Sequence, residues 1–408
     1  MESYRFLILG GGMVAGYAAR QLLEDGVPAT DIGIVSADDV PPYERPPLSK
    51  GLLLGIDEEQ DIYINPPDTY GKGGVGLHIR TTVQGLDIRA KTLAAGDQEF
   101  SYERLLVATG ATPRTLDIPG SELPGVHYLR SLDDARSLRQ AVDTAKRAVV
   151  IGSGFIGMEV ASAFAQKDAE TTLLFQGERL WDSFMTPELS AYFARYYEER
   201  GVLIRANDSP QSFAGDTKLT AVRTVSGETL EADAAVAGIG VVPVTDFLEG
   251  SGLSIDNGVV VNEYLETGAP DVWAAGDVAN YQDTLFSRRR RIEHWDNAVE
   301  QGKHAARVMN GDRQPFVHVP YFFSDIFDLS YEYWGDQQGA DEVIHRADWD
   351  GGSIAVFWLR RGRMVAAFVM KRPDEERDAV QRWIRESTDL SGHRPALGEP
   401  DSDIAALP

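Results

Sequence analysis

The sequence predicts an α/β protein with two parallel-sheet domains and a small C-terminal α+β domain. Two glycine-rich segments, about 140 residues apart, each lie between an apolar run and a helical pattern. Beyond residue 321 the chain alternates apolar and polar residues in hairpin-like runs, and a helical pattern begins at residue 374. Strand, glycine turn and helix in that order are typical of Rossmann-like domains, and the terminal alternation is typical of antiparallel strands. A chain of 408 residues has room for two or three domains.

The first glycine-rich segment opens the chain. Phe6–Leu9 is an apolar run with the composition of a buried parallel strand. Gly10, Gly12 and Ala15 follow in the pattern G-x-G-x-x-A, and a helical pattern comes next. The first glycine permits a tight turn, the second leaves room for a pyrophosphate, and Ala15 lets the helix pack against the strand. Because a helix N-terminus attracts phosphates, the segment predicts a dinucleotide site.

An acidic residue after the next strand extends this prediction. Ile32–Val35 reads as the second parallel strand of a βαβ unit. In such units an acid near the end of that strand binds the ribose hydroxyls. Asp38 is better placed for this role than Asp39, and a solvated loop acid is the alternative.

A proline-rich loop follows at residues 41–51. Its four prolines preclude a regular helix through the middle, so it should present Arg45, Ser49 and Lys50 at fixed places. Two cations near a pyrophosphate would neutralise its charge. A plain surface loop is the alternative.

The second glycine-rich segment is complete. Gly152, Gly154 and Gly157 form G-x-G-x-x-G after an apolar strand and before a helix, so the chain should bind two nucleotide cofactors. Glu159 lies at the start of that helix, where an acid favours the helix dipole. Beyond the next strand come Glu178 and Arg179. An acid at this place favours NADH and an arginine favours NADPH, so the choice between the two cofactors stays open.

Further elements are expected along the chain. Short strands should occupy residues 75–109, and Ser131 or Asp133 should cap a helix. Another helix is expected at residues 188–201. The apolar strand at residues 272–277 ends in Gly-Asp, which suits a carboxylate that faces a polyhydroxy chain.

Three further features are expected in the C-terminal half. A helix at residues 292–310 carries His294, for which no second metal ligand is evident, so no metal is predicted. The basic run Arg288–Arg291 reads first as a solvated loop and second as a docking patch. The tail from Ser391 reads as a surface strap or a partly disordered segment.

Composition limits the chemistry. There is no cysteine, which excludes disulfides, thiol nucleophiles, and zinc or iron–sulfur sites with cysteine ligands. The formal net charge of −24 disfavours nucleic acid and anionic membranes as partners. No apolar run is long enough to span a membrane, and there is no leader pattern, so a soluble cytoplasmic protein is expected.

Several motifs together resemble one family. The chain contains PYERPPLSK, ATGATPR, the second fingerprint that runs into Glu159, WAAGDVA and RIEHWDNAVEQG. It resembles the flavoproteins with two dinucleotide-binding domains, in the branch of ferredoxin and rubredoxin reductases, apoptosis-inducing factor and monodehydroascorbate reductase. The resemblance implies a discontinuous FAD-binding domain (1–113 and 243–318), an NAD(P)H-binding domain (114–242) and a C-terminal α+β domain (319–408).

The resemblance also implies two sets of cofactor-binding residues. The FAD set is Gly10, Gly12, Ala15, Asp38, Arg45, Lys50, Val83, Thr109, Gly110, Arg130, Asp277, Glu293, His294, Trp295 and Phe323. The NAD(P)H set is Gly152, Gly154, Phe155, Ile156, Gly157, Glu159, Glu178 and Gly240, with Glu293 also along the nicotinamide path. Lys50 and Glu159 would form a catalytic pair beside the flavin, where the nicotinamide stacks. Phe323 would shield the flavin, at a position where ferredoxin reductases usually carry Trp.

The implied reaction passes a hydride from NAD(P)H to FAD and then single electrons to a ferredoxin or rubredoxin. A monodehydroascorbate reductase is the second interpretation, although its two ascorbate-binding arginines appear here as Val299 and Asp325. A third is an NADH-sensing flavoprotein similar to apoptosis-inducing factor. The physiological acceptor stays open, as does the choice between monomer and homodimer.

Overall fold

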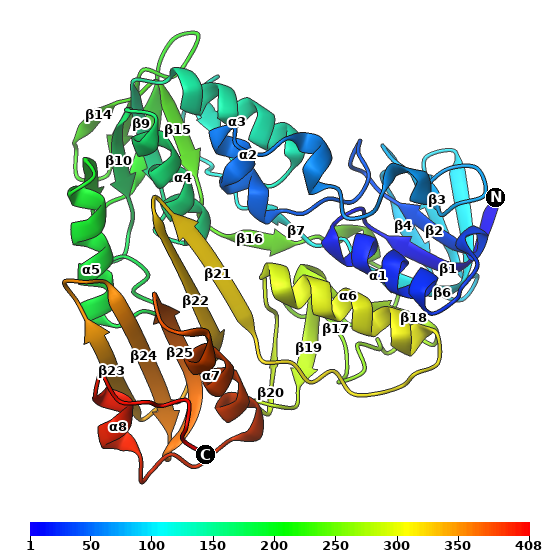
Figure 1. Cartoon of the computed structure of the whole chain (residues 1–408). Coiled ribbons are helices and arrows are strands. Elements are labelled where there is room, and N and C mark those ends of the chain that lie inside the picture. The colour runs from blue at the N-terminus through cyan, green and yellow to red at the C-terminus, as the bar shows by residue number, and fades with distance from the viewer. The chain divides into compact units, whose positions relative to one another are not determined.

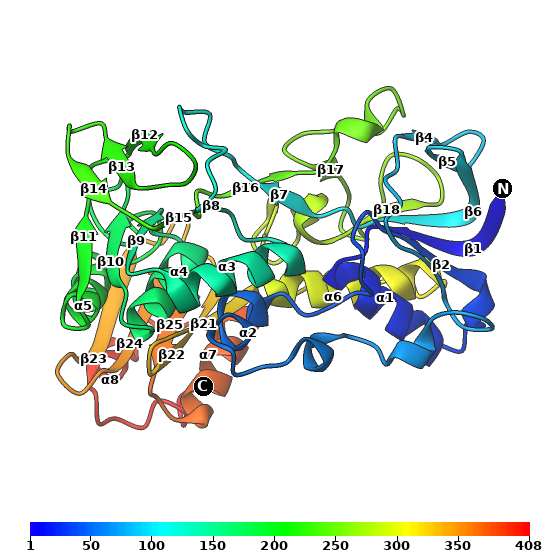
Figure 2. The ribbon, with the colours of Figure 1, turned by 90° about the horizontal axis from the view of Figure 1, so that it is seen from above.

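The computed structural model describes all 408 residues and divides into two compact units (Figures 1 and 2). Unit 1 consists of Met1–Arg45, Glu59–Thr112 and Val242–Tyr321. Unit 2 consists of Pro46–Glu58, Pro113–Val241 and Phe322–Pro408. Two short strands, β7 (Ala111–Pro113) and β16 (Val241–Pro243), lie where the chain passes from one unit to the other.

Unit 1 is built on a seven-stranded sheet whose centre is β1. Phe6–Leu9 of β1 is buried because parallel strands flank it on both sides, β2 on one and β6 on the other. The sheet contains β1 (Glu2–Leu9), β2 (Ile32–Val35), β3 (Gly76–His78), β4 (Gly85–Asp87), β5 (Thr92–Ala95), β6 (Gln98–Val107) and β18 (Val272–Ala274). A central strand with two buried faces explains the continuous apolar run.

Two helices of unit 1 lie side by side against this sheet (Figure 1). They are α1 (Met13–Glu24) and α6 (Trp295–Met309). A Cβ at Gly302 of α6 would lie 2.9 Å from the carbonyl oxygen of Val14 in α1, so glycine allows the close approach. A smaller sheet is formed by β17 (Val259–Val260), β19 (Ala279–Asp283) and β20 (Arg288–Arg290).

Unit 2 contains a parallel sheet of the same type, in the strand order β11-β10-β9-β15-β8. Its strands are β8 (Val126–His127), β9 (Arg147–Ile151), β10 (Glu170–Leu174), β11 (Val202–Arg205) and β15 (Ala234–Ala237). The helices of this part are α2 (Gly51–Leu54), α3 (Leu132–Thr144), α4 (Phe155–Gln166) and α5 (Pro187–Glu198). An antiparallel sheet adds β12 (Pro210–Ala214), β13 (Ala221–Thr224) and β14 (Thr229–Glu231).

The C-terminal part of unit 2 is an antiparallel sheet in the order β21-β22-β25-β24-β23, with two helices. Its elements are β21 (Tyr321–Ile326), β22 (Leu329–Gly335), β23 (Glu342–Asp348), β24 (Ser353–Arg360), β25 (Arg363–Met370), α7 (Asp374–Glu386) and α8 (Arg394–Gly398). Nearly every residue of β24 and β25 is buried, so the sheet is covered on both faces. These elements confirm the predicted α/β class with a terminal α+β part.

Most predicted helices are present with shifted ends. Ser131 caps α3, and Asp134 completes a capping box, so Ser131 rather than Asp133 is the N-cap. The helix predicted from residue 188 begins at Pro187 with Thr186 as its N-cap. The helix predicted from residue 292 begins at Trp295.

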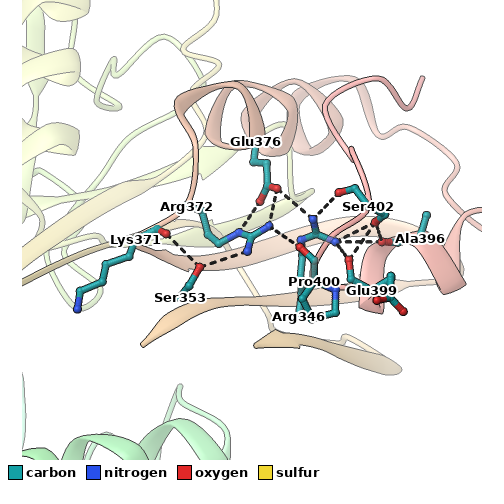
Figure 3. A network of polar contacts seen from close by, with 9 residues as sticks. All are labelled: Arg346, Ser353, Lys371, Arg372, Glu376, Ala396, Glu399, Pro400 and Ser402. Atoms are coloured by element: carbon teal, nitrogen blue, oxygen red, sulfur yellow. Dashed lines mark hydrogen bonds and ion pairs between the residues drawn. The ribbon is translucent and has the colours of Figure 1, made fainter. Parts of the chain in front are cut away.

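Of the two expectations for the tail, the partly disordered segment was wrong, whereas a strap on the surface agrees with the structure. Leu397 and Ile404 are fully buried, and Arg346 of β23, with 1% of its side chain exposed, binds the tail (Figure 3). Its guanidinium donates to the carbonyl oxygens of Ala396 and Glu399, as well as to Ser402. The tail therefore packs as part of the domain. A buried arginine on a strand gives no local signal that a distant segment will bind it.

The first interpretation of Arg288–Arg291, a solvated loop, was wrong. Arg288–Arg290 form strand β20, which pairs with β19. Arg290 forms an ion pair with Asp283, and the two side chains are only 9% and 4% exposed. Arg289 donates to the carbonyl oxygens of Val261 and Asn280, and Arg291 to that of Asp277. These contacts tie the run to unit 1, so it is not a solvated loop, and the docking patch stays a prediction.

The compact units differ from the predicted domains at two places. Residues 46–58, predicted as part of the FAD-binding domain, belong to unit 2, since Ser49 and Lys50 bind Glu159 there. The predicted domains 114–242 and 319–408 lie in one unit rather than two. The assignment of each domain to a cofactor stays a prediction.

Candidate active site

The first fingerprint lies at the N-terminus of α1 in unit 1. Gly10 has φ +118°, and a Cβ there would lie 2.2 Å from the carbonyl oxygen of Ala108, so only glycine fits the turn. Gly12 is the N-cap of α1, and no side chain caps the helix. A Cβ at Gly12 would meet only the guanidinium of Arg45, at 3.7 Å. Uncapped N–H groups with a cation beside them fit a bound pyrophosphate.

The acid predicted to bind ribose is held in place. Asp38 is half-buried and accepts a hydrogen bond from the hydroxyl of Tyr43 at 3.1 Å. Its own N–H donates to the hydroxyl of Ser36, and the neighbouring Asp39 pairs with Arg80 at 3.2 Å. The geometry favours a fixed carboxylate over a freely solvated one. Val83 is also buried in this unit.

The other predicted FAD residues of unit 1 lie at strand ends and at the start of α6. The Thr109 hydroxyl donates to the carbonyl oxygen of Val244 at 2.8 Å, and Gly110 has φ +66°. Asp277, which is 8% exposed, lies in the short turn after β18. His294 is the N-cap residue of α6, and burial lowers its pKa to about 4. Glu293 forms an ion pair with Arg291 at 2.6 Å.

Glu44 is a residue that sequence reasoning missed. The indole N–H of Trp295 donates to one Glu44 oxygen at 2.6 Å, and the Tyr17 hydroxyl donates to the other. Glu44 thus joins the proline-rich loop, α1 and α6 of unit 1. Its place next to Arg45 in the PYERPP motif was the available signal.

The second fingerprint lies at the N-terminus of α4 in unit 2. A Cβ at Gly157 would lie 2.0 Å from the carbonyl oxygen of Gly152, so the third glycine is required by packing. Gly154 is the N-cap of α4, has no side-chain cap, and has nothing within 4 Å of the place where a Cβ would be. This open, uncapped N-terminus repeats the arrangement at Gly12 and also fits a phosphate.

The remaining NAD(P)H candidates differ in exposure. Ile156 is 36% exposed and Glu178 is exposed, whereas the Phe155 ring packs against Phe322 with centroids 4.4 Å apart. Gly240 accepts a hydrogen bond from the backbone N–H of Arg114 at 2.9 Å. Arg130, which was predicted in the FAD set, also lies in this unit. Its backbone N–H donates to the side chain of Asp134, and its own side chain is not part of the capping box.

A buried carboxylate cluster surrounds Glu159. Glu159 is the fifth residue of α4, beyond the first turn, so the interpretation as a helix-dipole acid was wrong. Its side chain is 4% exposed and forms an ion pair with Lys50, which is 15% exposed. The hydroxyls of Ser49 and Ser324 also donate to it, Ser324 at 2.5 Å. Three donors satisfy a carboxylate that would otherwise be costly to bury.

Ser324 is the second residue that sequence reasoning missed. It is fully buried on β21, next to the predicted Phe323. The Lys50 ammonium lies 5.5 Å from the centroid of the Phe323 ring, within the range of a cation–π interaction. Lys50, Glu159 and Phe323 are therefore brought together within unit 2, as the resemblance implies. A serine on a distant strand carries no motif that could have revealed it.

Comparison with known proteins identifies relatives over nearly the whole chain. A family model described as pyridine nucleotide-disulphide oxidoreductase matches residues 4–302. A second, described as the C-terminal domain of monodehydroascorbate reductase 3-like proteins, matches residues 319–395. The peroxisomal monodehydroascorbate reductase 4 of Arabidopsis thaliana is 34% identical, covering 93% of this chain and 82% of that protein. A probable ferredoxin reductase of Castellaniella defragrans is 33% identical, covering 99% and 98%.

A solved structure agrees with these relatives. The covalent complex of putidaredoxin reductase with putidaredoxin contains a chain that matches with a TM-score of 0.91 at 31% identity. The match covers 98% of this chain and 96% of that chain. Likeness therefore extends over both units, including the C-terminal sheet.

Two uncapped, glycine-lined helix N-termini and the terminal α+β sheet define an oxidoreductase with two dinucleotide cofactors. The chain belongs to the pyridine nucleotide-disulphide oxidoreductase family. It is a flavin-dependent NAD(P)H oxidoreductase, which confirms the predicted cofactors FAD and NADH or NADPH. Since the chain has no cysteine, it contains no redox-active disulfide. No helix has the length and apolarity needed to cross a bilayer.

Proposed function

We propose that this enzyme oxidises NAD(P)H and passes electrons one at a time to a ferredoxin-type protein. The observation that carries the proposal is the match to a putidaredoxin reductase over 98% of this chain, in a structure solved with putidaredoxin. The likeness to a probable ferredoxin reductase over 99% of the chain supports it. A rubredoxin is the alternative protein acceptor. We place the enzyme in the cytoplasm, as a monomer or homodimer.

The chain's own residues bind and orient the two cofactors. FAD, when bound, supplies the chemistry that converts a two-electron hydride donor into a source of single electrons. The α1 N-terminus, Gly12 and Arg45 would hold its pyrophosphate, and Asp38 its ribose. The α4 N-terminus at Gly154 would hold the phosphates of NAD(P)H. The remaining predicted residues of both sets keep their proposed roles.

Lys50 and Glu159 are proposed as the catalytic pair. The ammonium of Lys50 is held by a carboxylate that is itself fixed by Ser49 and Ser324. Such a pair keeps a positive charge at a defined place in a site from which water is largely excluded, where electrostatic effects are strong. No general base is required for hydride transfer. The pair would therefore act by position and charge.

Monodehydroascorbate reduction is the second candidate. The C-terminal family model and the Arabidopsis relative favour it. Against it, Asp325 and Val299 occupy the positions where the resemblance implies two arginines. Val299 is 4% exposed in α6, and Asp325 is exposed on β21. A carboxylate in place of a guanidinium would repel an anionic radical, so this activity ranks second.

The test is rapid mixing of the flavin-loaded enzyme with NADH or NADPH, followed by ferredoxin, rubredoxin or the monodehydroascorbate radical. Fast bleaching with fast reoxidation by ferredoxin supports the proposal and identifies the nicotinamide. Fast reoxidation by the ascorbate radical alone supports the second candidate. Slow reoxidation by all three, together with NADH-dependent dimerisation, would support a sensor and contradict the reductase.

A further inference from the structure

Two helices of unit 1 begin close to each other, next to the first fingerprint. A Cβ at Gly276 would lie 2.5 Å from the Val14 side chain of α1 and 3.9 Å from the Ala298 side chain of α6. Val14 and Ala298 belong to the first turns of their helices. The uncapped start of α1 at Gly12, the turn that carries Asp277 and the start of α6 therefore lie close together within unit 1.

The carboxylate of Glu44 connects the two helices in this region. One oxygen accepts the indole N–H of Trp295, the first residue of α6, at 2.6 Å. The other oxygen accepts the hydroxyl of Tyr17, which belongs to α1. Because both oxygens are engaged, the carboxylate has a fixed orientation, and so do the two rings that donate to it.

The two donors to Glu44 keep their protons at neutral pH. Burial, together with the hydrogen bond to Glu44, raises the pKa of the Tyr17 hydroxyl, so the hydroxyl stays protonated. The indole of Trp295 acts as a donor only. Hydrogen bonds to a carboxylate are roughly twice as strong as those between neutral groups. Glu44 therefore holds both rings firmly, although it is itself only half-buried.

The main chain around Glu44 is held independently of its side chain. Residues 42–44 pair with residues 62–64 through a β-bridge and backbone hydrogen bonds. The next residue is Arg45, whose guanidinium lies 3.7 Å from the place of a Cβ at Gly12. A substitution of the Glu44 side chain leaves this backbone pairing intact, so Arg45 should keep its place. Any effect on FAD should then come through the side-chain partners of Glu44.

We propose that Glu44 is a positioning residue for FAD, which acts by holding the Trp295 ring. An indole has a single N–H group, and that of Trp295 is donated to Glu44. Trp295 therefore meets the flavin through its ring rather than through its N–H, and a ring contact depends on the orientation of the ring. This role rests on the proposed FAD contact of Trp295, and Glu44 itself need not touch the cofactor.

Glu44→Leu and Glu44→Gln test this role, and Glu24→Leu at the exposed end of α1 is the matched control. Dilution of the flavin-loaded enzyme, followed by the fluorescence of released FAD, gives the dissociation constant. Glu44→Leu should raise this constant at least about tenfold, because both donors lose their acceptor. Glu44→Gln should raise it less than about threefold, since an amide oxygen still accepts from the indole.

A second readout separates orientation from simple loss of stability. Visible circular dichroism of the bound flavin reports the surroundings of its ring. The spectrum should change in Glu44→Leu and return in Glu44→Gln to that of the unaltered enzyme. In a Trp295→Phe background there is no N–H for Glu44 to hold, so Glu44→Leu should raise the dissociation constant less than about threefold. If Glu44→Leu does not fold, Tyr17→Phe replaces it: this variant removes one donor and should raise the constant about two- to threefold.

An effect of Glu44→Leu no larger than that of Glu24→Leu would overturn the positioning role. So would an undiminished effect of Glu44→Leu in the Trp295→Phe background, or a Tyr17→Phe variant that binds FAD like the unaltered enzyme. Trp295→Phe with unchanged FAD binding and an unchanged spectrum would overturn it as well, by contradicting the proposed flavin contact. Failure of the unaltered enzyme to reduce ferredoxin would contradict the proposed function and leave these FAD results standing.

Discussion

The hydroxyl of Ser324 donates a hydrogen bond to Glu159 at 2.5 Å, which joins β21 to a helix 165 residues earlier in the chain. The same carboxylate binds Ser49 and Lys50 from a third segment. Unit 2 therefore assembles this cluster from three parts of the sequence. A carboxylate with three donors is fixed in orientation as well as in charge.

Ser324→Ala should weaken both stability and hydride transfer. The variant leaves one Glu159 oxygen with Lys50 as its remaining donor, at a cost of about 1–3 kcal/mol in unfolding free energy. If Ser324 also orients the pair, flavin reduction by NAD(P)H should slow roughly tenfold, as measured by stopped flow. Ser330→Ala, an exposed serine on β22, is the control and should change neither quantity. Lower stability with an unchanged reduction rate would make Ser324 purely structural.

Lys50→Met should destabilise the protein more than the double variant Lys50→Met/Glu159→Gln. The single change leaves a carboxylate buried with two neutral donors, and losing one partner of a buried pair typically costs about 3–5 kcal/mol. The double change removes both charges and should recover much of that loss. Denaturant unfolding measures the difference. Flavin reduction should stay slow in both variants, and a double variant less stable than the single one would contradict this account.

Arg346→Met should release the C-terminal tail. The guanidinium donates to the tail and pairs with Glu376, which also binds Arg372 at 2.6 Å (Figure 3). Loss of the buried cation leaves Glu376 with Arg372 as its one partner and removes the charged donor from the carbonyl oxygens of Ala396, Glu399 and Ser402, so we expect about 3–5 kcal/mol of destabilisation. Hydrogen exchange should show faster exchange around Leu397 and Ile404. Protection there that matches the unaltered protein would refute the role of Arg346.

Arg290→Met should impair folding and leave the choice of electron acceptor unchanged. Its pair with Asp283 is almost fully buried, so the unpaired aspartate should cost about 3–5 kcal/mol. Material that does fold should reduce ferredoxin and ferricyanide in the same ratio as the unaltered enzyme. A selective loss of ferredoxin reduction would instead support the docking patch.

The sequence predicted those features that depend on local pattern. The strand before Gly10 and the open helix N-termini at Gly12 and Gly154 follow from runs of adjacent residues, so short-range chemistry was sufficient. The Lys50–Glu159 pair came only from family resemblance, because 109 residues separate its members. The roles of Ser324 and Arg346 were missed for the same physical reason. Their partners are brought near by the fold, and neither position carries a pattern of its own.

His294→Gln should reveal a pH-dependent cost of burial. The pKa of His294 falls to about 4 in the folded protein because burial disfavours the imidazolium, whereas an unfolded histidine titrates near 6.5. The unfolded chain therefore binds a proton first, and the stability tied to His294 is complete above about pH 6.5 and lost as the pH falls toward 4. At pH 5 this amounts to about 2 kcal/mol relative to pH 8, and glutamine does not incur it. Unfolding of the flavin-loaded protein and its variant at both pH values measures the difference. Relative to the unaltered protein, the variant should be more stable at pH 5 than at pH 8. A difference in unfolding free energy between the two proteins that is the same at both pH values would show that His294 does not titrate with folding.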